Sequence, residues 1–120
     1  MRISAKIPVA LAFALAATQA FAHAQLEKST PPVGGTVHSA KEIRLEFSEG
    51  VEPRFTKVEL TRGDGSVVQL GAQRVEGADK NVLVVPIINA LAPGAYTVHW
   101  HAVAVDTHHT QGDFSFTVQP

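Results

Sequence analysis

The chain has 120 residues, no cysteine and one methionine, and its ten basic and eleven acidic residues give a net charge of −1. This length allows one domain, and the lack of cysteine excludes disulfides, thiolate metal sites and cysteine nucleophiles. Because phosphate binding depends on many Lys and Arg contacts, the charge argues against nucleic acid or an anionic membrane as the partner.

The first 22 residues are typical of a secretory signal peptide. Arg2 and Lys6 supply a positive start, residues 7–17 an apolar run, and residues 20–22 (AFA) a small-x-small cleavage site. The apolar run has 11 residues, too few for a membrane-spanning helix, which needs about 20. A retained anchor or a buried N-terminal helix is the alternative interpretation.

Cleavage after Ala22 would make His23 the first residue of the mature protein. The mature domain, residues 23–120, would carry a net charge of −3 and no methionine, because Met1 leaves with the leader. Cleavage after Ala20 or Ala24 is the alternative, and either would remove the terminal histidine.

From Leu26 onward, short strand-like runs alternate with turns rich in Gly, Pro and Asp. Residues 41–47 alternate between apolar and charged side chains, and residues 63–65 (GDG) form a hairpin turn. Residues 81–87 form a continuous apolar run that indicates a strand buried on both faces, ending near Pro86. The expected strands are residues 41–47, 55–61, 66–70, 81–87, 91–105 and 112–118.

The run 91–105 is expected to be the longest strand, with Tyr96 and Trp100 on its core face. Tyr96 lies in a pattern (LAPGAY) that is similar to the tyrosine corner of immunoglobulin-like domains. His99 and His101 should lie on the solvated face, with a second metal site as the alternative. We expect an all-β fold, an immunoglobulin-like or cupredoxin-like Greek-key sandwich or small barrel of about seven to eight strands.

Three residues carry the candidate chemistry: His23, Asp106 and His108. A terminal histidine offers an amine and an imidazole, and both must lose protons to bind a metal. On an extended segment, Asp106 and His108 would share a face, as residues two apart do. Three nitrogens and one oxygen suit copper(II), which also heads the divalent affinity order; zinc is the main rival.

Four stretches, HAQLEKSTPPVGG, IRLEFSEGVE, LAPGAYTVHWHAVAVDTHH and GDFSFTV, resemble the CopC family of periplasmic copper-binding proteins. The resemblance implies that His23 binds copper(II) through amine and imidazole, and that Asp106 and His108 complete the site. It also implies that Glu49 is an outer ligand or the hydrogen-bond partner of the amine. His109, where relatives often have proline, would be a neighbouring outer group.

The sequence departs from the better-known family members, which carry a methionine-rich loop for copper(I). Residues 23–120 have no methionine, and soft thioethers are what select copper(I). The chain therefore resembles the subgroup with a single copper(II) site.

The expected function is copper homeostasis or resistance in the periplasm, without catalysis, by a monomer that does not span the membrane. The resemblance suggests storage, sequestration or delivery to an inner-membrane transporter of the CopD type. One alternative is a copper mono-oxygenase that uses an N-terminal histidine. The other is a plain immunoglobulin-like interaction module with incidental histidines.

Overall fold

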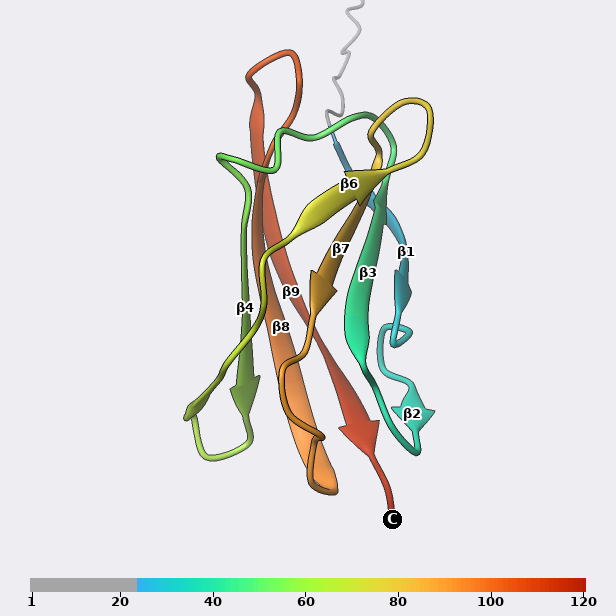
Figure 1. Cartoon of the computed structure of the whole chain (residues 1–120), viewed down its shortest axis with the longest axis vertical. Helices are drawn as coiled ribbons and strands as arrows, with labels where there is room; N and C mark the ends of the chain where they lie inside the picture. Colours follow the sequence, from blue (N-terminus) through green and yellow to red (C-terminus); the bar gives the residue numbers. More distant parts are fainter. Residues whose placement is uncertain (1–23) are drawn as a thin grey trace, which may run out of the picture.

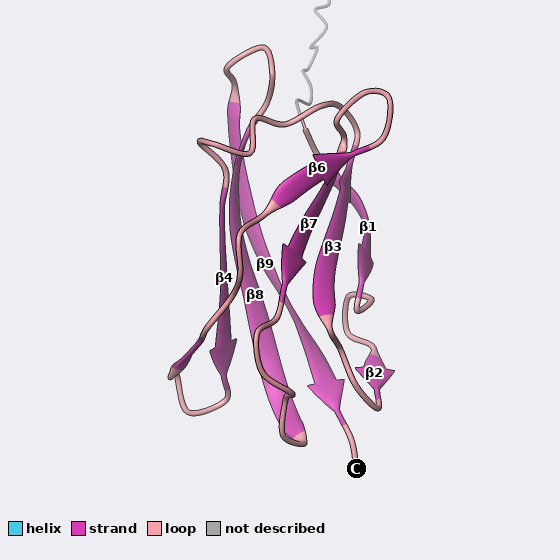
Figure 2. Ribbon diagram, viewed as in Figure 1, coloured by secondary structure: helices cyan, strands magenta, loops and turns pink. Residues whose placement is uncertain are grey.

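The computed structural model describes residues 24–120, which form two β-sheets packed face to face (Figure 1, Figure 2). The predicted signal peptide, residues 1–22, and His23 lie outside the described residues. Residues 24–120 contain no helix, and so none that could cross a membrane. The two sheets share no strand, which confirms the all-β sandwich rather than the small barrel.

Nine strands are present in residues 24–120, in the orders β1-β3-β7-β6 and β2-β9-β8-β4-β5. Their bounds are β1 Leu26–Thr30, β2 Thr36–Val37, β3 Glu42–Phe47, β4 Lys57–Arg62, β5 Val67–Val68, β6 Arg74–Glu76, β7 Val82–Pro86, β8 Gly94–Val103 and β9 His109–Val118. Each of the six predicted strands is confirmed, whereas β1, β2 and β6 were not expected. Such short strands hold too few apolar residues to show a period in the sequence.

The four-stranded sheet follows the predicted apolar pattern. On β3, Ile43, Leu45 and Phe47 are fully buried and alternate with half-buried polar residues on the outer face. On β7, three consecutive residues, 83–85, are buried, and Pro86 is the last residue of the strand. A continuous apolar run therefore marks a strand that is buried on both faces, and an alternating run marks a strand with one solvated face.

The five-stranded sheet is built around β8, which pairs with β9 over its whole length and with β4 on its other side. The predicted β4–β5 hairpin is confirmed. The tyrosine corner is also confirmed, because the Tyr96 hydroxyl donates a hydrogen bond of 2.6 Å to the Ala92 carbonyl oxygen. His99 and His101 are half-buried on the outer face, and Trp100 between them is buried.

Trp100 links the two sheets in the core. Its side chain packs edge-to-face against Phe47 of β3, with the ring centroids 5.3 Å apart. The residue opposite it on β9 is Gly112, where a Cβ would lie 2.7 Å from an indole carbon. The lack of a side chain at Gly112 therefore lets β9 approach the indole.

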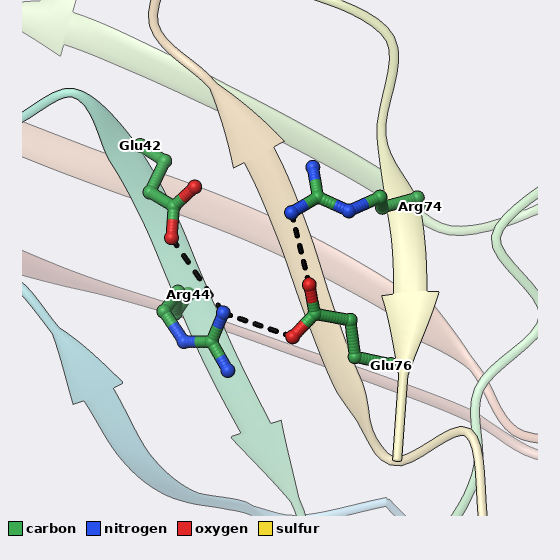
Figure 3. Close-up of polar contacts among 4 residues, drawn as sticks. All are labelled: Glu42, Arg44, Arg74 and Glu76. Atoms are coloured by element: carbon green, nitrogen blue, oxygen red, sulfur yellow. Dashed lines mark hydrogen bonds and ion pairs between the residues drawn. The ribbon is translucent and has the colours of Figure 1, made fainter.

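The outer face of the four-stranded sheet carries a network of charged side chains (Figure 3). Arg44 donates a hydrogen bond of 3.0 Å to Glu76 and lies 3.5 Å from a Glu42 oxygen, and Arg74 donates to Glu76 at 2.9 Å. These bonds, first from Arg74 and then from Arg44, hold the pKa of the Glu76 carboxyl below its usual range. The network links β3 to β6 across β7.

Candidate metal centre

Three segments that are distant in the sequence meet at one end of the sandwich (Figure 1). Ala24, the first described residue, is fully buried, and its carbonyl oxygen accepts a hydrogen bond of 3.1 Å from the Thr110 hydroxyl. The next residue, Gln25, exchanges hydrogen bonds with Ser48, from its N–H to the hydroxyl at 2.9 Å and from its carbonyl to the N–H at 2.8 Å. The start of the described chain is thus fixed between the β3–β4 connection and the start of β9.

The β3–β4 connection is paired in turn with the end of β8. Val51 bridges Ala104, and the Val105 N–H donates to the Gly50 carbonyl at 3.0 Å. Gly50 is buried, and a Cβ on it would lie 2.4 Å from the Asp79 carbonyl oxygen, so only glycine fits at this approach. Glu49, which precedes Gly50, is half-buried next to this pairing.

Asp106 and His108 lie in the loop between β8 and β9, and their carboxylate Oδ1 and imidazole Nδ1 are 3.2 Å apart. The prediction that this segment is extended is wrong, because the loop is a tight turn. The Thr107 N–H donates to the Ala104 carbonyl at 2.8 Å, and Thr107 has a φ of 77°. The turn, rather than strand alternation, brings the two side chains together.

The same Asp106 oxygen also accepts a hydrogen bond of 3.2 Å from the His108 backbone N–H. This is the turn-capping role that aspartate commonly plays in loops. Both side chains remain accessible, with 60% of His108 and 39% of Asp106 exposed. Two donors bound at about 2 Å to one ion lie about 2.8–3.4 Å apart, so the observed separation fits a shared metal as well as a hydrogen bond.

His109, the predicted outer group, contacts His101 of β8, with the His109 Nδ1 3.3 Å from the His101 Nε2. This cross-strand contact could not be found from sequence spacing, because it depends on the β8–β9 register. Within residues 24–120, no three His, Cys, Asp or Glu side chains form a group that could hold a metal. The roles of His23, Asp106, His108, Glu49 and His109 in metal binding therefore stay predictions.

The sequence model of the CopC domain matches residues 26–119. The chain belongs to the CopC family. The matched segment contains Glu49, Asp106 and His108 and begins just after His23.

Two relatives align with this CopC-family chain over most of their length. It is 39% identical over 111 residues to Protein YobA of Escherichia coli (strain K12), covering 91% of this chain and 89% of the relative. It is 34% identical over 116 residues to Copper resistance protein C of Xanthomonas campestris pv. juglandis, covering 92% and 91%.

A solved structure supports the same membership. The crystal structure of PcoC, described as a methionine-rich copper resistance protein from Escherichia coli, has a TM-score of 0.71 and 33% identity to this chain. The superposition covers 82% of this chain and all of PcoC. The present chain differs in composition, since its one methionine is Met1.

Proposed function

We propose that this protein binds one copper(II) ion in the periplasm and serves copper homeostasis or resistance, without catalysis. Membership of the CopC family supports the copper chemistry, because relatives in this family are named copper resistance proteins. The proposed ligands are the amine and imidazole of His23, the carboxylate of Asp106 and the imidazole of His108.

The observation that carries this proposal is the meeting of the three segments described above. Ala24 is held by Thr110, two residues after His108, and Gln25 is held by Ser48. Consecutive Cα atoms are about 3.8 Å apart. The amine and imidazole of residue 23 would therefore lie at the same end of the sandwich as Ala24. A terminal histidine that starts there would have the Asp106 and His108 loop close by, because Thr110 follows that loop by two residues.

The donor set favours copper(II) over other divalent ions. Three nitrogens and one carboxylate oxygen suit a tetragonal copper(II) site, and copper(II) heads the affinity order for such donors. Zinc, which takes the same donors tetrahedrally, is the competitor. Glu49 is half-buried and precedes Gly50, which pairs with Val105; it would accept a hydrogen bond from the amine and so orient it, as outer groups do for metal ligands. His109 would serve as a neighbouring outer group.

The methionine content supports a site for copper(II) alone. Copper(I) prefers soft thioether ligands, and residues 23–120 contain no methionine or cysteine. The protein would therefore belong to the CopC subgroup with a single copper(II) site, unlike the methionine-rich PcoC.

A non-catalytic role is supported by the burial of the large aromatic side chains of β8. Tyr96 is 3% exposed and Trp100 is 9% exposed, so neither offers a flat aromatic surface to a polysaccharide. The protein would act as a monomer that stores copper(II) or delivers it to an inner-membrane transporter of the CopD type. Residues 1–22 would direct export, and residues 23–120 would be the working domain.

The proposal is tested by the intact mass of the exported protein, measured under native conditions with and without copper(II). We expect a polypeptide that begins at His23 and gains the mass of one copper ion at one equivalent. A polypeptide that begins elsewhere, or one that takes up no copper at one equivalent, would contradict the proposal. Mass after denaturation fixes the cleavage position independently of copper binding.

A further inference from the structure

The outer face of the five-stranded sheet gathers histidines from two neighbouring strands. His99 and His101 are two residues apart on β8, and His109 begins β9. The register pairs Val103 with His109 and His101 with Gln111. His101 and His109 are therefore diagonal neighbours on one face, a position from which long side chains reach each other.

The two rings of His101 and His109 are in contact. The His101 Nε2 and the His109 Nδ1 are 3.3 Å apart, and the ring centroids are 5.1 Å apart with an angle of 49° between the planes. At this separation one nitrogen donates its proton to the lone pair of the other. If that proton moves to the remote nitrogen of its own ring, both facing nitrogens present lone pairs toward one point.

This separation is the one that a shared metal ion requires. Two nitrogens bound at about 2.0–2.1 Å to a tetrahedral ion lie about 3.3–3.4 Å apart, and a square-planar ion draws them a few tenths of an ångström closer. The geometry points to a second metal site at His101 and His109, for a divalent ion that prefers imidazole, copper(II) before zinc. It uses none of the proposed copper ligands His23, Asp106 and His108, so it does not depend on them, although His109 lies next to that first site.

His99, on the same face, has other partners for its ring nitrogens than His101 has. Its Nε2 lies 3.2 Å from the Thr61 hydroxyl, and its Nδ1 lies 3.8 Å from an Asp113 oxygen. Both of its ring nitrogens therefore have protein partners. His99 is the matched control, because it shares the strand, the face and the half-buried exposure of His101.

The surroundings leave room for further ligands on the ion. His109 is exposed, and His101 lines an open hollow of about 500 Å³ together with His99, Lys57, Glu59 and Trp100. Water would complete the coordination. The pair supplies two protein donors, whereas the first copper site would have four: an amine, two imidazoles and a carboxylate. The pair should therefore bind copper more weakly and fill at the second equivalent.

Calorimetric titration of the chain that begins at His23 with copper(II) tests the inference. We expect a second, weaker equivalent whose affinity falls by about tenfold or more in His101→Ala and is unchanged in His99→Ala. Equal effects of the two substitutions, or no second equivalent, would overturn it. In a chain with one alanine added ahead of His23, the His101-dependent equivalent should persist, which separates this inference from the first site.

Nuclear magnetic resonance of the unsubstituted protein gives a readout that does not depend on how a variant folds. Adding zinc, which is diamagnetic, should shift the ring resonances of His101 and His109 and leave those of His99 in place. Shifts at His99 alone, or at none of the three rings, would contradict a site at the pair.

Discussion

The outer faces of the two sheets bring side chains from different strands together for different chemistry. On the four-stranded sheet, Arg44 of β3 reaches Glu76 of β6 across β7, and Arg74 pairs with Glu76 along β6 (Figure 3), so that opposite charges satisfy one another. On the five-stranded sheet, register brings the imidazoles of His101 and His109 together. The carboxylate of Glu76 is neutralised by two guanidinium groups and so attracts a cation weakly, whereas two neighbouring imidazoles can turn lone pairs toward one.

The difference separates stability from binding. The proposed metal donors of the described chain lie on the five-stranded sheet or on the loop that joins its two longest strands. The charge network lies on the opposite layer and links β3 to β6. Substitutions of these metal donors should change metal binding, and substitutions in the charge network should change the stability of the fold alone.

Among substitutions within the described residues, those in the β8–β9 loop should have the largest effect on copper binding. Replacing the ligand imidazole in His108→Ala, or the carboxylate in Asp106→Ala, should weaken copper(II) binding at the first equivalent by at least about tenfold, the loss seen even for outer groups. Competition against a coloured chelator measures the affinity. His38→Ala is the control, since His38 contacts Pro120 near the C-terminus. An unchanged affinity in both loop variants would remove the loop from the site.

Gly112→Ala should affect the core that both faces share. The new Cβ would lie 2.7 Å from the Trp100 indole, and a rigid aromatic ring can relieve that contact only by shifting. Overpacking of this kind costs about 1–3 kcal/mol of unfolding free energy. Urea titration followed by Trp100 fluorescence measures it.

Gly63→Ala is the matched glycine variant, because its nearest contact would be an ordinary 3.7 Å from the Ala95 carbonyl oxygen. Equal stability of the two variants would show that the strand and the indole are not tightly packed.

The smallest effect is expected from Glu76→Gln on the four-stranded sheet. The arginine bonds lower the pKa of Glu76 below its ordinary 4.5, so the charged form stabilises the fold above that pH. This contribution is lost as pH falls through the lowered pKa. The variant should be slightly less stable than the parent at neutral pH and equal to it in acid, with a smaller difference at high salt.

Denaturant titrations of both proteins at several pH values measure this difference. Glu27→Gln, on an exposed position of β1, is the control for loss of one surface charge. A difference between parent and Glu76→Gln that stays constant from neutral to acid pH would show that the ion pairs do not contribute.

The fold could be predicted because its strands carry strong periodic signals. Three patterns in the sequence indicate which side chains are buried: the alternation of residues 41–47, the apolar run at 81–87 and the tyrosine corner at Tyr96. The strands β1, β2 and β6 could not be predicted in this way. Each owes its pairing to a longer neighbour, which is β3 for β1, β9 for β2 and β7 for β6.

The sequence argument placed Asp106 and His108 on an extended segment, and the structure gives them a different local geometry. Asp106 and His108 do approach one another, yet a turn with a positive φ at Thr107 brings them together rather than an extended strand. The contact of His101 with His109 depends on which residues pair across two strands. Spacing along one strand carries no information on that register.

The proposed copper site requires His23 to be a free N-terminal residue, and one comparison tests this requirement directly. The copper(II) affinity of the chain that begins at His23 is measured beside that of the same chain with one alanine ahead of it. We expect the added residue to lower the affinity for the first equivalent of copper(II) by about a hundredfold or more, because it takes the amine away from its chelating imidazole. Equal affinities in the two chains would contradict it.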